Sequence, residues 1–319
     1  MAVLVGIDEA GFGPILGPLV VSSSTFSLPH SLLSADLWQI LKKSVADKRK
    51  RLAGRLLIAD SKKAHSKSLG IKHLQRTVLA AFRCLGKEPA TLTELIEILC
   101  PDCLERLCDY PWYRDADTHR ILVDDADKAI ASTVLADDMA SNGIKLLELK
   151  SCCLDVAYYN KMMSSVKNKA SVLFTATSRL IKNAFDNFAG DDLQIMIDRQ
   201  GGRVHYRKNL QRMFPEMELK ILRESPQISS YELQTNDKSM RLHFVVDADE
   251  RFLPVSLASM VSKYLRELLV YNINRYFVGH CADLKPTAGY WKDGLRFIEE
   301  LKMNIPYMQV NSNQLIRCR

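Results

Sequence analysis

The chain has 319 residues, of which 47% are hydrophobic and 25% are charged, with 14 Gly and 11 Pro. This composition is typical of a globular protein and excludes a disordered or collagen-like chain. The length corresponds to two domains, or to one core with a large insertion, and a core of this size needs no disulfide bonds. No uncharged apolar stretch is long enough to span a membrane, and residues 1–7 are too short for a secretion signal. We therefore expect a cytoplasmic protein.

Charge is distributed unevenly along the chain. The formal net charge is +7, yet residues 100–150 carry eleven acidic and six basic side chains, so the positive excess lies in the flanking parts. The asymmetry fits a polyanionic ligand held outside the acidic segment, and it fits an ordinary solvated surface equally well. We treat residues 84–150 as an acidic, largely helical insertion, and residues 1–83 with 151–319 as the core.

Apolar periodicity predicts both strands and helices. Two early apolar runs are rich in β-branched residues, which is typical of buried strands. Later segments repeat apolar residues every three to four positions, and Gly86 stands where a helix cap is expected. In chain order the expected elements are strands at 3–7 and 19–26, helices at 74–85 and 170–188, a strand at 193–197 and a helix from Pro254. Strands followed by alternating helices and strands predict a mixed α/β fold.

The chain contains eight cysteines. Cys100, Cys103 and Cys108 stand close enough in sequence for a zinc site that Cys84 or His119 could complete. No second pair at ligand spacing occurs, and residues 99–107 are apolar and compatible with a helix. We therefore expect these cysteines to be small buried side chains in a reducing compartment rather than metal ligands.

Acidic residues end two of the predicted strands. Asp8 and Glu9 close the first strand and are followed by Gly11 and Gly13, while Asp198 closes a later one. Because strand side chains alternate between faces, Asp8 and Glu9 reach one pocket only if the backbone leaves the strand there, which glycines permit. Carboxylates gathered at neighbouring strand ends repel one another unless cations compensate, and Mg²⁺ and Mn²⁺ prefer such oxygen ligands.

Each of these features also has an ordinary structural interpretation. An Asp-Glu pair before glycines occurs in turns and helix caps. The acids at 247–250 can complement the dipole of the helix that begins at Pro254. Ser259, Lys263 and Arg266 can form a solvated helix face. The functional interpretation is favoured by the combination and order of the features.

The joint pattern resembles the ribonuclease HII family, whose members have the ribonuclease H fold. Five segments carry the resemblance in the family's order: residues 6–21 (first strand and glycine loop), 60–63 (Asp-Ser-Lys motif), 197–198 (third acid at a strand end), 249–267 (fourth acid, serine-bearing helix, Lys and Arg) and 287–290 (late Gly-Tyr element). The resemblance covers about residues 1–83 and 151–302. It implies a ribonuclease H-like mixed sheet flanked by helices, with C-terminal helices.

The resemblance also implies a reaction. It implies a two-metal site for Mg²⁺ or Mn²⁺ and hydrolysis of the RNA strand of RNA/DNA hybrids, or of ribonucleotides embedded in duplex DNA, leaving 3′-hydroxyl and 5′-phosphate ends. Asp249 is preferred to Asp247 because it precedes Ser259 by ten residues, which is the family's spacing. The implied metal-binding catalytic acids are Asp8, Glu9, Asp198 and Asp249.

The implied substrate-binding residues are Gly11, Phe12, Gly13, Lys62, Lys63, Ser259, Lys263 and Tyr290. The glycine loop and Tyr290 are expected at the ribose 2′-hydroxyl, which distinguishes RNA from DNA. The lysines are expected at phosphates that flank the cut, and Ser259 at an acid or a phosphate. The sequence departs from the family in two ways: Phe12 stands where the family has Arg, and ordinary members lack the acidic insertion.

Three other functions remain open on the sequence alone. The chain could be a nucleic-acid-binding protein of the same fold with altered catalysis, which would show no metal-dependent cleavage. It could be a DNA-directed nuclease, which would cut duplexes that contain no ribonucleotide. It could serve a structural role centred on the insertion, and deletion of residues 84–150 would then abolish function while Asp8→Asn would not. No membrane partner is expected, and the protein partner of the insertion is left unspecified.

Overall fold

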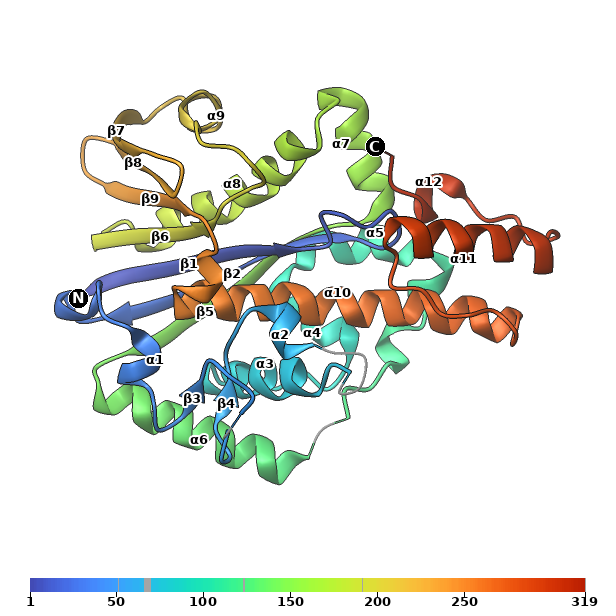
Figure 1. Cartoon of the computed structure of the whole chain (residues 1–319), viewed down its shortest axis with the longest axis horizontal. Helices are drawn as coiled ribbons and strands as arrows, with labels where there is room; N and C mark the ends of the chain where they lie inside the picture. Colours follow the sequence, from blue (N-terminus) through green and yellow to red (C-terminus); the bar gives the residue numbers. More distant parts are fainter. Residues whose placement is uncertain (51, 66–69, 123, 191, 319) are drawn as a thin grey trace.

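The computed structural model describes residues 1–50, 52–65, 70–122, 124–190 and 192–318. Its core is a seven-stranded mixed sheet in the order β5-β2-β1-β6-β9-β8-β7 (Figure 1). The strands are β1 Ala2–Ala10, β2 Leu19–Leu28, β5 Lys145–Leu154, β6 Asp192–Asp198, β7 Glu218–Glu224, β8 Ile228–Gln234 and β9 Ser239–Val245, with β3 Val45–Ala46 and β4 Leu56–Leu57 as a separate pair. The strands expected at 3–7, 19–26 and 193–197 are confirmed as β1, β2 and β6.

Strand directions decide where the functional residues meet. β1 runs antiparallel to β2 and parallel to β6, with Ile7 opposite Ile197. β6 in turn runs parallel to β9, with Asp198 opposite Val245. Parallel neighbours end at the same edge of a sheet, so the carboxyl ends of β1, β6 and β9 lie side by side.

Helices cover both faces of the sheet. The helices are α1 Leu37–Ile40, α2 Ser61–Ala64, α3 Lys72–Cys84, α4 Leu92–Leu99, α5 Leu104–Cys108, α6 Asp125–Ser141, α7 Val156–Val166, α8 Lys169–Phe188, α9 Arg207–Met213, α10 Leu253–His280, α11 Trp291–Asn304 and α12 Ser312–Leu315. Single 3₁₀ turns span His30–Leu32, Pro101–Cys103, Pro111–Tyr113, Ala116–Thr118 and Ala248–Glu250. In Figure 1, α7 and α8 lie above the sheet and α3, α6 and α10 lie below it. The expected mixed sheet flanked by helices is confirmed.

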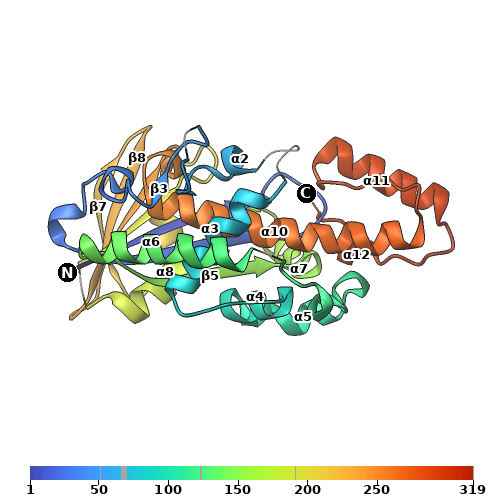
Figure 2. The same cartoon turned by 90° about the horizontal axis from the view of Figure 1, so that it is seen from below.

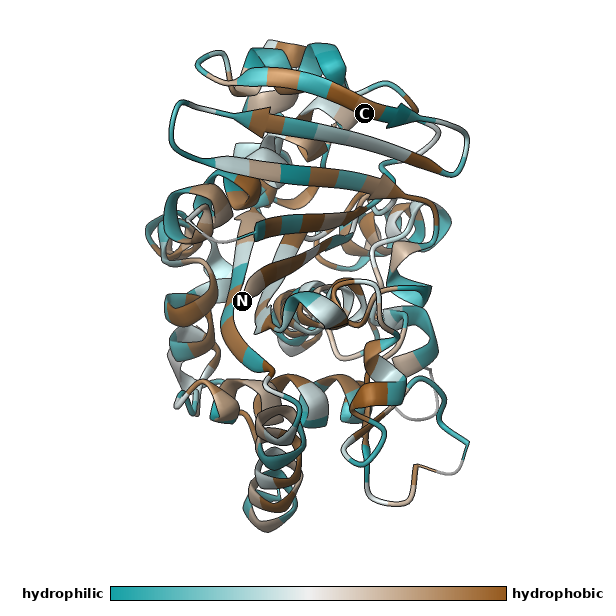
Figure 3. Cartoon of the chain, turned by 90° about the vertical axis from the view of Figure 1, so that its left-hand side faces the viewer, coloured by the Kyte–Doolittle hydropathy of each residue, from teal (hydrophilic) through white to brown (hydrophobic). Residues whose placement is uncertain are grey.

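The two faces of the sheet belong to separate hydrophobic clusters. Alternate β1 residues pack on opposite sides: Val5 packs with residues of α8, whereas Leu4 packs with residues of α3 and α10. This alternation is the period-two pattern of a strand buried on both faces. Figure 3 shows hydrophobic residues on the central strands and hydrophilic residues on the loops around them.

The long helix α10 lies directly against β1. Its first turn carries Pro254, as the sequence predicts, because a proline's fixed φ suits the start of a helix. Gly6 of β1 faces this turn, and a Cβ at that position would lie only 2.5 Å from the Pro254 carbonyl oxygen. The contact between backbones brings α10 close to the end of β1 where the acids stand.

The acidic segment packs against the core. Residues of α4 and α6 share one hydrophobic cluster with α3, α10 and the sheet. The boundary expected at residue 150 falls inside β5, whose first residues pair with β2 at the edge of the sheet. Residues 99–107, whose sequence is compatible with a helix, are not one continuous helix: Cys100 has φ −155°, because a following proline disfavours the helical conformation.

The cysteines considered for zinc are not gathered into one group. Cys100 and Cys103 are buried with their Sγ atoms 3.6 Å apart, but Cys108 is exposed. His119 contacts Asn272 Nδ2 at 2.8 Å, and the thiol of Cys84 donates to the Ser132 carbonyl oxygen at 3.5 Å. In the described part of the chain, no His, Cys, Asp and Glu side chains form a group of three or more arranged to hold a metal ion.

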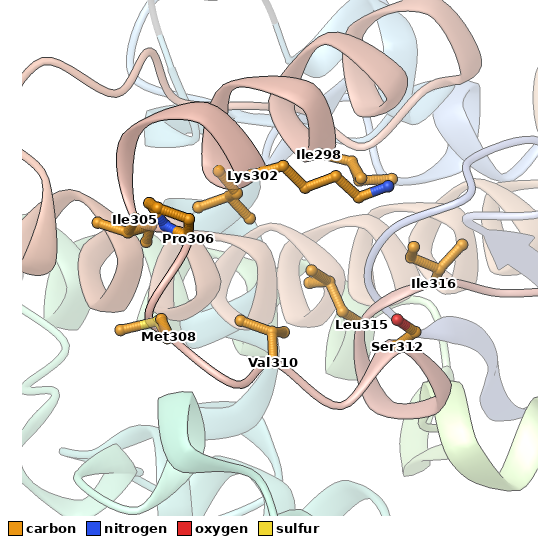
Figure 4. A pocket seen from close by; sticks show the side chains of 10 residues that line it. Ile298, Lys302, Ile305, Pro306, Met308, Val310, Ser312, Leu315 and Ile316 are labelled. Atoms are coloured by element: carbon orange, nitrogen blue, oxygen red, sulfur yellow. The ribbon is translucent and has the colours of Figure 1, made fainter.

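The C-terminal region lies beside the far half of α10, at the opposite end of the molecule from the N-terminus (Figures 1 and 2). After α11 the chain turns back, and Arg317 N donates to the Ile15 carbonyl oxygen at 2.8 Å. A largely apolar cavity of about 380 Å³ separates α11 from this returning segment (Figure 4). No helix among the described residues has the length and apolar character needed to cross a bilayer.

Candidate active site

Three strand ends bring carboxylates together at one edge of the sheet. Asp8 and Glu9 lie near the carboxyl end of β1, and Asp198 is the last residue of the neighbouring strand β6. Asp247 and Asp249 follow β9, the next parallel strand. The observed topology therefore brings Asp8, Glu9, Asp198 and Asp249 close together, as the sequence led us to expect.

One cavity of about 240 Å³ collects these carboxylates. It is lined by six acidic side chains, two lysines, two serines, a tyrosine and the glycine loop. The lining residues are Asp8, Glu9, Ala10, Gly11, Phe12, Gly13, Pro14, Asp60, Ser61, Lys62, Asp198, Asp247, Asp249, Ser259, Lys263 and Tyr290. All the site residues expected from the sequence are among them except Lys63, whose ammonium group is 2.6 Å from Glu250 Oε1 in an exposed pair.

The turn after β9 sets the positions of Asp247 and Asp249. Asp247 has φ +51°, a left-handed conformation that Asp adopts more readily than most residues. The turn is held to β6 because Ala248 N donates to Asp198 Oδ1 at 2.8 Å. Asp249 lies in the following 3₁₀ turn, and its carbonyl accepts a hydrogen bond from the Ser256 hydroxyl. Both acids line the cavity, so Asp247 and Asp249 are both available to it.

Two polar cavity residues, Asp60 and Ser61, had no role assigned from the sequence. Asp60 caps α2 by accepting from Lys62 N at 3.0 Å, and Ser61 Oγ accepts from Ser259 Oγ at 3.1 Å. Their signal in the sequence was the Asp-Ser-Lys motif, from which only the lysines had been assigned a role. The strand-end argument misses Asp60 because it precedes a short helix and reaches the cavity only through the packing of α2 against α10.

Burial and mutual repulsion raise the pKa values of the carboxyls. Burial, together with Glu9 and Asp198, raises the pKa of Asp8 well above its usual value. Burial and Asp198 raise the pKa of Glu9 to about 7. Burial, Asp60 and Asp198 raise the pKa of Asp249 to about 7. In the protein alone, this concentration of negative charge is only partly compensated by Lys62.

The donor set suits a hard divalent cation. Carboxylate oxygens dominate the cavity, and Mg²⁺ and Mn²⁺ favour such ligands. Cations would also relieve the repulsion that raises these pKa values. Among the described residues, no group of three or more acidic, His or Cys side chains is placed to hold a metal ion. One carboxylate oxygen of Asp8, Oδ1, accepts a hydrogen bond from the backbone N–H of Glu9 at 2.7 Å.

The glycine loop beside the acids has no room for side chains at Gly11. Its φ is +96°, and a Cβ there would lie 2.6 Å from the Pro18 carbonyl oxygen. Gly13 differs, because a Cβ there would make only an ordinary van der Waals contact with the Tyr290 ring, at 4.0 Å. Gly11 is thus required by the fold, whereas a small side chain at Gly13 would fit beside Tyr290 without a clash.

Tyr290 is held over this loop by a buried arginine and a glycine. Arg266 Nη2 donates to the carbonyl oxygens of Ala288 (3.0 Å) and Leu16 (3.3 Å). The Gly289 carbonyl oxygen accepts from Ile15 N at 2.8 Å. The Tyr290 side chain itself is half-exposed. The loop and the tyrosine therefore form one unit whose open side is the cavity.

The solvated-face interpretation of α10 is wrong for this part of the helix. Ser259 is 2% exposed and Arg266 is 1% exposed, and Lys263 Nζ lies 2.5 Å from Glu267 Oε1. These polar residues face the protein because α10 crosses the sheet at the carboxyl end of β1. The sequence could not distinguish a solvated helix face from one directed at the site, because residues on either face repeat with the same helical spacing.

Phe12, which stands where the family has Arg, contacts both the hydrophobic core and the cavity. It packs at the border of the hydrophobic cluster that contains α8, with the ammonium group of Lys169 5.1 Å from the centre of its ring. The residue still lines the cavity, so a side chain at position 12 reaches the site.

The chain is similar to known proteins in its three-dimensional structure. No family model matches the sequence, and no curated protein matches it. Similar solved structures include the PCNA:RNase HII complex from Archaeoglobus fulgidus, at 15% identity over 99% of this chain and 94% of that one, with a TM-score of 0.45. The ribonuclease H2 from Pyrococcus horikoshii OT3 is 12% identical over 98% and 92%, with a TM-score of 0.40.

A third similar structure is Bst-RNase HIII in complex with Mn²⁺, at 16% identity over 93% of this chain and 62% of that one, with a TM-score of 0.41. The chain resembles ribonucleases of these types in fold, as the motifs of its sequence predict. At such low identities and TM-scores the likeness concerns the fold alone, and the function proposed next depends on the geometry of the site itself.

Proposed function

We propose that the chain is a divalent-metal-dependent endonuclease that hydrolyses the RNA strand of RNA/DNA hybrids, or ribonucleotides embedded in duplex DNA. One observation carries the proposal: acids from three parallel strand ends share a cavity with a glycine loop and a tyrosine. The carboxylates supply metal ligands, and the loop with the tyrosine supplies a place to read a sugar. The two features adjoin within a single cavity.

The acids would hold the metal ions in this proposal. Two Mg²⁺ or Mn²⁺ ions, held by Asp8, Glu9, Asp198 and Asp249, would lower the pKa of a bound water and neutralise charge on the scissile phosphate. The Asp198 carboxylate is oriented by Ala248 N, and the Asp8 carboxylate by Glu9 N. Asp247 and Asp60 line the same cavity and are the next candidates to take part in ion binding.

The chain's own donors would bind and orient the substrate. Lys62 and Lys263 line the cavity and would neutralise phosphates that flank the cut, although Lys263 would have to share its charge with Glu267, whose Oε1 lies 2.5 Å from its Nζ. Lys63 would have to leave Glu250 before binding a phosphate. Ser259, hydrogen-bonded to Ser61, would hold α2 and α10 together under the phosphates.

Sugar recognition is assigned to the glycine loop and Tyr290. In this proposal the sugar edge would approach the main chain at Gly13, where no side chain stands between the loop and the Tyr290 ring. A 2′-hydroxyl there can donate to or accept from the loop, which a deoxyribose cannot do. Phe12 contributes an apolar edge to the cavity in place of a cationic one.

A cleavage assay on three duplexes tests the proposal. The purified chain is incubated with all-DNA duplex, DNA with one ribonucleotide, and full RNA/DNA hybrid, each with Mg²⁺, with Mn²⁺ and with chelator. We expect cuts only in ribonucleotide-containing strands and only with metal. Cleavage of all-DNA duplex would indicate a DNA-directed nuclease. Binding without cleavage under every condition would indicate a binding protein of the same fold.

Replacing Phe12 by arginine should strengthen binding to nucleic acid. The new guanidinium would stand at the edge of the cavity and contact one additional phosphate. In titrations at several salt concentrations, the slope of log affinity against log salt should become steeper by about one. Phe12→Leu, which keeps an apolar side chain, is the control and should leave the slope unchanged. An unchanged slope for Phe12→Arg would place residue 12 outside the phosphate path.

A further inference from the structure

A groove of about 790 Å³ adjoins the carboxylate cavity, and the acidic segment forms one of its walls. Residues 118–122 of that segment face the part of α10 that follows Lys263, with the start of α3 and residues 287–288 closing the ends. We call this cavity the α10 groove. Its lining includes His119, Arg120, Leu122, Tyr271 and Arg275.

The α10 groove continues the candidate active site along one stripe of the helix. Lys263 lines the carboxylate cavity, and Glu267, which pairs with Lys263 at 2.5 Å, lines the groove. Tyr271 and Arg275 follow at successive turns on the same side. At 1.5 Å per residue, Tyr271 stands about 12 Å from Lys263 along the helix and Arg275 about 18 Å. A strand that leaves the carboxylates along α10 therefore passes both residues within a few nucleotides.

The chemistry of the groove combines stacking surfaces with cations. Tyr271 is 53% exposed, and its ring centre lies 5.0 Å from that of His119. Leu122 is also strongly exposed. Arg120 and Arg275 are exposed at the rim, and the acid in the lining, Glu267, is matched by Lys263. Accessible rings beside guanidinium groups are typical of sites for unpaired nucleotides, whereas a duplex hides the faces of its bases.

We propose that the α10 groove binds an unpaired nucleic-acid strand that flanks the cleaved duplex, with a base stacked on Tyr271 and phosphates near Arg120 and Arg275. The proposal rests on the nuclease function proposed above, because that function supplies the strand. It gives the acidic segment a role, which is to form the outer wall of a groove that the core alone would leave open. It makes the chain selective for junctions between duplex and single strand.

Binding of labelled duplexes tests this proposal without cleavage. Fluorescence anisotropy is measured in chelator with a blunt RNA/DNA hybrid and with four versions that carry a five-nucleotide overhang at one end of one strand. We expect at least one overhang to tighten binding roughly 5- to 100-fold, as stacking of one or more bases would do. In Tyr271→Ala that gain should be lost while affinity for the blunt hybrid stays the same.

Matched variants separate this result from a general loss of binding. Tyr307 is 75% exposed and lies outside the groove, so Tyr307→Ala should keep the overhang gain. Arg275→Gln should reduce the gain and make its salt dependence weaker by about one. No gain from any overhang, equal losses on blunt and overhang duplexes, or a chain dimer that Tyr271→Ala dissociates would each overturn the proposal. An overhang gain in a chain that cleaves none of the duplexes would refute the nuclease function and leave the groove assignment standing.

Discussion

Asp8→Asn is expected to abolish cleavage of an RNA/DNA hybrid while leaving hybrid binding nearly unchanged. The substitution keeps the shape of the side chain but removes one charged ligand from the centre of the six-acid cavity. Losing several kcal/mol of transition-state stabilisation corresponds to a fall in rate of about a thousandfold or more. Single-turnover cleavage with Mg²⁺ and with Mn²⁺ measures this fall, and anisotropy with the same hybrid measures binding.

A control acid on β6 makes the result specific. Asp192 and Asp198 stand at opposite ends of that strand, and Asp192 pairs with Gln194 and His30 away from the cavity. Asp198→Asn should match Asp8→Asn, whereas Asp192→Asn should cleave normally. Adding Mg²⁺ should raise the melting temperature of the unaltered chain and of Asp192→Asn more than that of Asp8→Asn. Full activity in Asp8→Asn would refute the assignment of the catalytic acids.

Gly6→Ala is expected to cause the largest loss of stability from a single methyl group. The new Cβ would lie 2.5 Å from the Pro254 carbonyl oxygen, and closer still to the Pro254 carbonyl carbon and to Val255 N. These are backbone atoms at the first turn of α10, so α10 must move away from β1. We expect destabilisation of about 3 kcal/mol or more, and a fall in melting temperature of roughly 5–10 °C.

The effect should extend to the site, because α10 also carries Ser259 and Lys263. Cleavage by Gly6→Ala measured below its melting temperature should therefore fall as well. Gly190→Ala is the matched control, since a Cβ there has no atom within 4 Å and should change stability little. If Gly6→Ala melts at the same temperature as Gly190→Ala, β1 and α10 do not pack as closely as described.

The sequence alone allowed most of the candidate site to be predicted. Asp8, Glu9 and Asp198 were expected together because apolar runs ending in acids identify strand ends, and the ends of parallel strands gather at one edge. Asp249 and the lysines were predicted only through the resemblance to the ribonuclease HII family. The helices expected at 74–85 and 170–188 and from Pro254 are confirmed as α3, α8 and α10 because their apolar faces repeat over several turns.

Packing between elements decided what the sequence left open. Asp60 enters the cavity because α2 lies against α10, and Lys63, its neighbour in the same motif, instead pairs with Glu250 at the surface. Arg266 is buried beneath Tyr290 by contacts with Leu16, 250 positions away in sequence, and with Ala288, 22 positions away.

Local residue chemistry and periodicity thus determined the strands and the long helices, and they identified acids at strand ends, because those signals lie within a few neighbouring residues. The tertiary structure alone decided how residues 84–150 are used. Their last part became the edge strand β5, and residues 118–122 came to face α10 across a groove. Such placements depend on contacts between residues more than a hundred positions apart, for which a single sequence carries no periodic signal.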